Sequence, residues 1–234
     1  MGSEMCIRDR WNEALHGVGR AGLATVFPQA IGMGASFNNE LLYDVFTAVS
    51  DEARAKNTEF SKEGGLKRYQ GLTMWTPNIN IFRDPRWGRV SEGNGEDPFL
   101  GGAIAKAMVS GYQGVDLNNQ LKRNDEIMAC VKHFALYGAG EAGRDYNTVD
   151  MSRNRMFNEY LYPYQAAVEA GVGSVMASFN EIDGVPATAN KWLMTDVLRK
   201  QWGFDGFVVT DFTGISEMVA HGIGDLQTVS ARAL

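Results

Sequence analysis

Polar side chains that could do chemistry stand at the ends of short apolar runs. Asp211 directly follows the run 206–210, and Lys132 and His133 lie near the end of the run 127–134. A carboxylate that emerges at the end of a buried strand can act as a nucleophile if nearby cations or hydrogen-bond donors hold its pKa down. Lys132, His133 and Arg89 are candidates for that role and for binding sugar hydroxyls.

Lys132 also permits a different reaction. A lysine at the end of a strand can form a Schiff base when desolvation lowers its pKa, and the adjacent His133 would help it lose a proton. An aldolase of this kind would need a phosphate site or an apolar pocket. The surrounding Arg, Asp, Asn and Trp residues are instead typical of polyol recognition, so the Schiff-base aldolase is the less favoured enzyme.

The aromatic and acidic residues of the same region have two interpretations each. Trp75, Trp87 and Phe212 could stack on sugar rings, and core packing explains them equally well. Asp84 and Arg86 are expected to pair with each other or with backbone. Asp97 is expected to cap a helix with Pro98 at its first position. The remaining nearby acids are predicted to be loop or cap residues: Glu92, Glu96 and Glu181.

The elements that must position these residues alternate along the chain. Apolar runs rich in β-branched or aromatic residues predict strands over 72–81, 127–134, 173–179 and 206–210. Apolar residues at three- and four-residue spacing predict helices over 39–57, 98–114, 152–170 and 191–202. The series predicts an α/β fold, an incomplete (β/α)8 TIM-barrel-like domain, in preference to a doubly wound sheet. In such barrels the chemistry lies at the carboxyl ends of the strands.

Composition limits the classes of function. The 234 residues are 44% hydrophobic, and 22 basic against 28 acidic residues give a net charge of −6, which argues against nucleic acid and anionic membranes as partners. Cys6 and Cys130 lack metal-ligand spacing, so we expect no metal and no cofactor. The expected partner is a small uncharged molecule.

Six stretches, in order along the chain, resemble glycoside hydrolase family 3, the β-glucosidase and β-xylosidase family. They are Trp11–Gly17, Asp84–Arg89, Gly95–Pro98, Lys132–Phe134, Ser178–Asn180 and Gly203–Asp211. The resemblance implies a retaining β-glycosidase that hydrolyses terminal non-reducing β-D-glucosyl residues of small β-linked oligosaccharides or glycosides through a covalent intermediate. It implies Asp211 as nucleophile. It also implies that the following residues form the sugar subsite: Glu13, Arg89, Lys132, His133, Met176 and Phe179.

The chain departs from the family pattern at three points. Glu13 stands where many members have Asp, and Phe179 stands where many have Tyr, so a hydroxyl that could bond the nucleophile is missing. No histidine follows Lys132–Phe134 closely enough to act as acid/base, which the resemblance then assigns to a carboxylate of a second domain.

Residues 1–10 are predicted to be a foreign leader, residues 11–234 a partial barrel domain, and residues 225–234 a helix cut short. We expect the second domain to be absent and the chain alone to be inactive.

Two alternatives remain open at this point. The chain could come from a β-xylosidase or arabinosidase of the same family, or it could be a non-catalytic carbohydrate-binding remnant of a barrel. The resemblance suggests a periplasmic or secreted enzyme, although charged residues interrupt the N-terminus where a signal peptide needs an apolar stretch.

Overall fold

The computed structural model describes residues 11–62, 65–118, 120–123 and 126–225. The predicted leader and nearly all of the predicted terminal helix lie outside these described residues.

Five parallel strands follow one another in chain order. They are β1 (Trp11–Asn12), β2 (Thr73–Met74), β3 (Cys130–Phe134), β4 (Ser174–Ala177) and β7 (Phe207–Thr210). β1 pairs with β2, β4 lies between β3 and β7, and single bridges from Thr73 to Met128 and from Asn78 to Lys132 join β2 to β3. A small antiparallel pair, β5 (Glu181–Ile182) and β6 (Val185–Pro186), follows β4. The carboxyl ends of the five parallel strands therefore face the same way.

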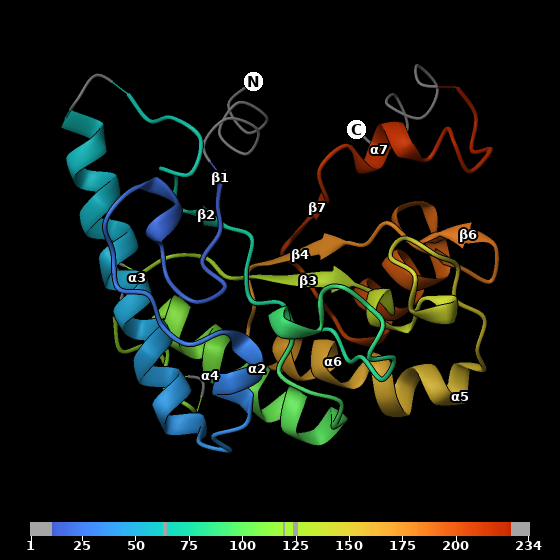
Figure 1. Ribbon diagram of the computed structural model, residues 1–234, viewed down its shortest axis with the longest axis horizontal. Helices are drawn as coiled ribbons and strands as arrows, with labels where there is room; N and C mark the ends of the chain where they lie inside the picture. Colours follow the sequence, from blue (N-terminus) through green and yellow to red (C-terminus); the bar gives the residue numbers. More distant parts are fainter. Residues whose placement is uncertain (1–10, 63–64, 119, 124–125, 226–234) are drawn as a thin grey trace.

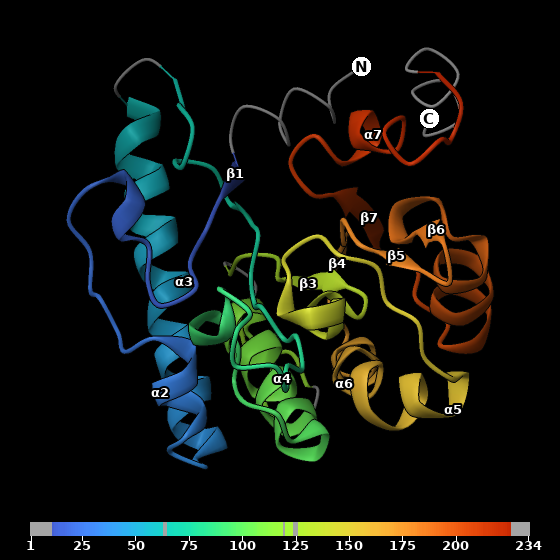
Figure 2. The same cartoon turned by 45° about the vertical axis from the view of Figure 1, so that its right-hand side comes forward.

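A helical segment lies between each parallel strand and the next. The longer ones are α3 (Asn39–Lys62), α4 (Pro98–Gln113), α6 (Tyr162–Glu169) and the π-helical η7 (Trp192–Gln201). α4 packs between α3 and α6, and the three helices follow one another beside the strands (Figures 1 and 2). The remaining helices and turns are α2 (Ala30–Gly34), α5 (Arg153–Arg155), α7 (Gly214–Glu217), η1 (Gly19–Ala21), η2 (Val90–Glu92), η3 (Tyr137–Ala139), η4 (Glu141–Gly143), η5 (Met156–Tyr160) and η6 (Ala187–Ala189).

The predicted strand–helix alternation and the α/β class are confirmed. The run 72–81 forms only the short β2 because Pro77 has no N–H to donate, yet the segment still follows β3: Lys132 N donates to Pro77 O (3.0 Å) and Ile79 N to Lys132 O (2.9 Å). Among the described residues the strand series is open, with β1 and β7 as its ends, so the structure contains no closed barrel.

The predicted helix over 152–170 divides into α5, η5 and α6. Leu161 N bonds to Met156 O at 2.8 Å, which widens one turn. α6 then begins at Tyr162, with Pro163 in its first turn, where a missing N–H is tolerated. Ser152 caps the first segment, and its hydroxyl accepts from Arg155 N. The sequence pattern therefore locates the helical region correctly but not its interruption.

The core lies between the strands and α3, α4 and α6. Phe46 and Tyr112 are fully buried with ring centroids 4.9 Å apart, and the Tyr112 hydroxyl donates to Ala14 O at 2.7 Å, which ties α4 to the segment after β1. Gly111 lets α3 and α4 approach closely, since a Cβ there would lie 2.6 Å from Tyr43 O.

We predict that Gly111→Ala lowers the free energy of unfolding by roughly 1–3 kcal/mol, because the methyl group would push the α3 backbone away. Gly32→Ala in α2 is the matched control: its added Cβ would meet its nearest atom at an ordinary 3.8 Å, so we expect a slight gain or no change. Urea unfolding of both variants measures the difference. Equal stability of the two variants would contradict the close contact between the helices.

Candidate active site

Asp211 lies at the carboxyl end of β7, and its side chain is only 13% exposed. Its Oδ1 accepts from Phe212 N at 2.6 Å, and its Oδ2 lies 3.5 Å from His133 Nε2. β7 pairs with β4 through Met176 and Val209, and β4 pairs with β3, which carries His133. The carboxylate and the imidazole therefore meet across three adjacent strands.

Arg89 reaches the same imidazole nitrogen, with its Nη2 3.2 Å from His133 Nε2. Glu92 holds the guanidinium with two bonds of 2.9 and 2.8 Å, and Asn78 Nδ2 donates to the same carboxylate at 3.2 Å. A two-bond pair of this kind fixes the direction of the guanidinium plane. Arg89 and Asp211 therefore approach the same imidazole nitrogen, and their sharing of a substrate pocket stays a prediction.

Lys132 lies in the middle of β3 and is 2% exposed, and its ammonium lies 3.5 Å from Glu13 Oε1. Glu13 also forms an ion pair with Arg20. Burial lowers the pKa of Lys132 to about 8, although the negative charge of Asp211 opposes the change. Lys132 is therefore a cation that loses its proton far more readily than an exposed lysine.

The net change in the pKa of Asp211 is opposite to the sequence expectation, although its neighbours act in the expected direction. Burial raises the pKa of Asp211 and outweighs the Phe212 N–H bond and the positive charges of Lys132 and Arg89, which lower it. Burial and the two cations also keep the pKa of His133 well below its usual value, so His133 is a neutral neighbour and not a cation. Of the two roles predicted for His133, cation or hydrogen-bond donor, its low pKa leaves the donor.

Met176 and Phe179, the two apolar residues of the expected subsite, belong to different clusters. Met176 is fully buried with Trp11, Trp75 and Cys130. Phe179 packs in the second cluster with Trp87 and Tyr137, and its ring centroid lies 4.6 Å from that of Tyr146. Their contact with a sugar stays a prediction.

The aromatic side chains divide between core and surface. Trp75 stacks on Trp11 at 4.0 Å, and Trp87 is 2% exposed with its Nε1 donating to Asp145 at 2.9 Å. Core packing therefore accounts for both in this chain. Phe212 is exposed, with the Arg68 guanidinium 5.7 Å from its ring centroid, and it remains available for stacking.

The loop expectations are confirmed for two motifs. They are corrected for Glu181, which lies in β5 and pairs with His221, and for one further residue. Arg86 pairs with Asp84 at 2.7 Å, and the Asp97 side chain caps α4 by accepting from Leu100 N at 2.7 Å. Glu92, predicted as a loop or cap residue, instead holds Arg89. The sequence analysis assigns no role to Asn78 and Asn80, which contact Glu92 and His133. Their spacing of two in an apolar run places them on one face of an extended segment, and this pattern is the signal that could have identified them.

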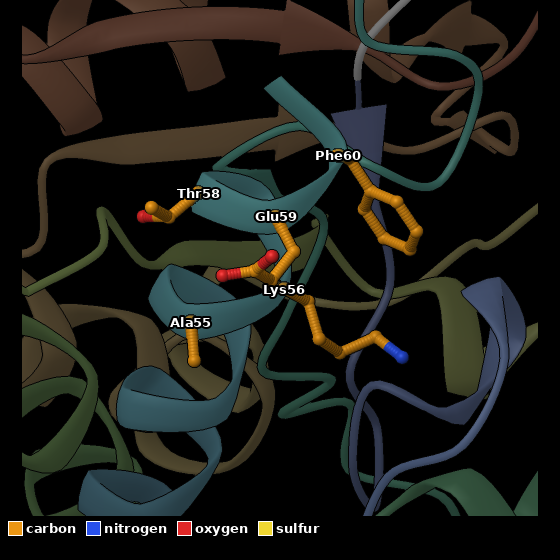
Figure 3. A pocket seen from close by; sticks show the side chains of 5 residues that line it. All are labelled: Ala55, Lys56, Thr58, Glu59 and Phe60. Atoms are coloured by element: carbon orange, nitrogen blue, oxygen red, sulfur yellow. The ribbon is translucent and has the colours of Figure 1, made fainter. Parts of the chain in front are cut away.

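A surface hollow lies elsewhere, along α3, where Figure 3 shows its lining of Ala55, Lys56, Thr58, Glu59 and Phe60. Lys56 donates to Leu23 O at 2.8 Å. The hollow includes none of the residues around Asp211, so it belongs to a different face of the chain.

Within residues 11–225, apart from the undescribed positions, no group of three His, Cys, Asp or Glu side chains could hold a metal ion. No helix in the same described part of the chain is long and apolar enough to cross a membrane.

The chain is similar to proteins of one known family. The model of the glycosyl hydrolase family 3 N-terminal domain matches residues 11–234. The chain is 43% identical to a periplasmic β-glucosidase of Salmonella typhimurium over 86% of its own length and 24% of that protein. It is 37% identical to a xylan 1,4-β-xylosidase of Xylanibacter ruminicola over 88% of its length and 24% of that protein.

A solved structure shows the same likeness. The β-glucosidase of Listeria innocua in complex with glucose is 39% identical, with a TM-score of 0.81 over 95% of this chain and 29% of that one. The same enzyme has been solved as a mutant with laminaribiose. These neighbours support a TIM-barrel-like fold. The chain spans about a quarter of the length of the curated relatives it matches.

We predict that Lys132 titrates near pH 8, charged below that pH and neutral above it, because its burial disfavours the ammonium. The Cε–Hε NMR signal of Lys132, assigned by its loss in Lys132→Met, measures the midpoint. As Lys132 loses its charge, Asp211 loses a cation that favours its carboxylate. A midpoint near the 10.5 of an ordinary lysine would contradict the burial of the ammonium.

Proposed function

The chain belongs to glycosyl hydrolase family 3, and on that premise we propose that Asp211 is the nucleophile of a retaining β-glycosidase that hydrolyses terminal β-D-glucosyl residues. The observation that carries the proposal is the meeting of Asp211 Oδ2 and Arg89 Nη2 at His133 Nε2, at 3.5 and 3.2 Å. A carboxylate, a fixed cation and an imidazole gathered at strand ends are suited to a polyhydroxylated substrate.

In the proposed reaction the Asp211 carboxylate attacks the anomeric carbon while the bond to the leaving-group oxygen breaks and that oxygen takes a proton. Water then cleaves the covalent glycosyl-enzyme, returning the Asp211 carboxylate and a sugar of unchanged anomeric configuration. Lys132, Arg89, His133 and Glu13 bind the sugar hydroxyls. Charge-assisted bonds from the two cations tighten as the ring flattens, which lowers the barrier selectively.

Met176 and Phe179 complete the proposed subsite from the apolar side. Phe179 carries no hydroxyl for the nucleophile, and Tyr146 lies against it. Burial raises the pKa of Tyr146, and the negative charges of Glu217, Asp145 and Asp211 add to the change in that order.

The acid/base is proposed to come from a second domain of the enzyme. A retaining mechanism needs a second carboxyl group about 5–5.5 Å from the first. Nearby acids have other partners: Glu92 binds Arg89, Glu181 binds His221, and Glu13 pairs with Arg20 and Lys132. The relatives' greater length leaves room for such a domain. The open strand series is proposed to be part of a (β/α)8 barrel.

Glucose is proposed as the cleaved sugar because the Listeria innocua neighbour was solved with glucose and with laminaribiose. Xylose is the second candidate, since several curated relatives of 35–39% identity are named β-xylosidases. The name of the Salmonella relative supports a periplasmic or secreted enzyme. A carbohydrate-binding remnant would keep the sugar contacts without the covalent step.

We predict that an activated 2-fluoroglucoside labels Asp211, because the carboxylate forms the glycosyl-enzyme and the fluorine slows its hydrolysis. Peptide mass spectrometry identifies the labelled residue, and the matching 2-fluoroxyloside compares the two sugars. Asp211→Asn is the control that should take no label. Labelling at Asp84, Asp145 or Asp150 would overturn the assignment, and faster labelling by the xyloside would favour xylose.

We also predict that the 234-residue chain does not turn over cellobiose. Loss of general acid catalysis removes roughly 10²- to 10⁴-fold of rate for poor leaving groups, whereas activated aryl glycosides need little protonation and still glycosylate Asp211. Parallel assays on cellobiose and on a dinitrophenyl glucoside measure the contrast. Robust cellobiose hydrolysis would place the acid/base within this chain.

A further inference from the structure

We infer that Asn80 is a positioning residue: its amide makes Nδ1 of His133 an acceptor, which leaves the ring proton on Nε2, the nitrogen beside Asp211. The inference deepens the proposed function in one respect, since the role of Asp211 belongs to that proposal. The tautomer itself follows from the hydrogen bonds of Asn80 and His133 alone.

The orientation of the Asn80 amide is determined by a backbone donor. His133 N–H can only donate, and it lies 3.1 Å from the Asn80 side-chain atom, which must therefore be the carbonyl oxygen Oδ1. The Tyr164 hydroxyl lies 2.9 Å from the same oxygen and 2.7 Å from His133 O. All three side chains are at most 3% exposed, so water does not compete for these bonds.

The other end of the amide then determines the imidazole. Asn80 Nδ2 lies 2.9 Å from His133 Nδ1, and because Nδ2 can only donate, Nδ1 must be an acceptor without a proton. Burial and the positive charges of Lys132 and Arg89 keep His133 neutral. A neutral imidazole has one proton, so it is on Nε2.

The Nε2 proton has one acceptor among its two neighbours. Asp211 Oδ2 at 3.5 Å can accept it, whereas the Arg89 Nη2 at 3.2 Å is itself a donor. Arg89 stays close because Glu92 holds its guanidinium from the other side. His133 thus offers a permanent donor to the nucleophile or to a sugar hydroxyl beside it, and has no free lone pair there with which to take a proton.

Asn80 is itself held firmly enough to perform this role. Its backbone N–H donates to Asn78 Oδ1 at 3.1 Å, and the adjacent Ile79 N–H donates to Lys132 O at 2.9 Å. The segment that carries the amide is therefore bonded to the strand that carries the imidazole, so the two side chains move together.

The two other histidines of the chain provide an internal contrast. His16 Nδ1 lies 3.1 Å from Phe27 O, and His221 Nδ1 lies 2.6 Å from Glu181 Oε1. Both partners are acceptors, so both nitrogens must have a proton. His133 is the one histidine of the three whose Nδ1 faces a donor.

Long-range ¹H–¹⁵N NMR of the labelled 234-residue chain near neutral pH reads the proton position of each ring directly. We expect His133, assigned by its loss in His133→Gln, to have a protonated Nε2 and a bare Nδ1, while His16 and His221 have protonated Nδ1 atoms. A proton on His133 Nδ1 in the unmodified chain would overturn the inference, whether or not any variant folds.

Asn80→Asp tests the cause. A carboxylate at this position offers an acceptor to Nδ1, so Nδ1 should gain a proton. Asn158→Asp, the same change on an exposed helical turn, should leave the His133 signals unchanged. An Asn80→Asp spectrum identical to that of the unmodified chain would show that Asn80 does not determine the tautomer.

A second experiment tests the effect of the tautomer on function by measuring the rate at which an activated 2-fluoroglycoside labels Asp211. We expect Asn80→Asp to slow it roughly ten- to a hundredfold, the effect of losing one hydrogen bond to a charged group, and Asn158→Asp to leave it unchanged. A switched tautomer with an unchanged rate would overturn the positioning role. Failure of the unmodified chain to be labelled would instead refute the proposed function and leave the NMR result standing.

Discussion

The site depends on burying several chargeable groups together in a region of low dielectric. Lys132 and His133 on β3 and Asp211 directly after β7 lie on either side of β4 and are almost removed from water. A buried charge is costly unless an opposite charge or a hydrogen bond compensates it. Each of these groups has a specific partner: Glu13 for Lys132, Asn80 for His133 and the Phe212 N–H for Asp211. Glu92 plays the same part for the nearby Arg89. The protonation states of the site follow from this compensation.

The scaffold supplies the other half of that arrangement. Parallel strands joined in chain order bring their carboxyl ends to one side, and the intervening helices cover the strands away from it. The α3–α4 packing at Gly111 and the bond from Tyr112 to Ala14 O fix the first strand region against the rest. Glu13, which follows β1, can therefore reach Lys132 on β3, although 119 positions separate them in sequence.

Two clusters of aromatic side chains lie near the buried charges. Trp11 and Trp75 stack in one cluster with Met176, and Trp87 and Tyr137 pack with Phe179 in the other, where the Tyr137 ring contacts that of His133. These rings are mostly buried, so their main effect is to exclude water and strengthen the electrostatic interactions between the groups they enclose. Phe212 and Tyr146 are the more exposed rings beside the site.

The sequence by itself determined the alternation of strands and helices, and with it the placing of Asp211, Lys132 and His133 at or near strand ends, because apolar periodicity and strand-end polarity are local properties. Only the tertiary structure decided which atoms meet. The residues around Glu92 in the sequence predict only a loop, whereas in the structure Glu92 binds the Arg89 guanidinium. In the same way, nothing in the sequence shows that the Asn80 amide contacts the His133 ring. The pKa of Asp211 is raised because the carboxylate is buried. This burial comes from packing between segments that are distant in the sequence, so the sequence alone does not predict it.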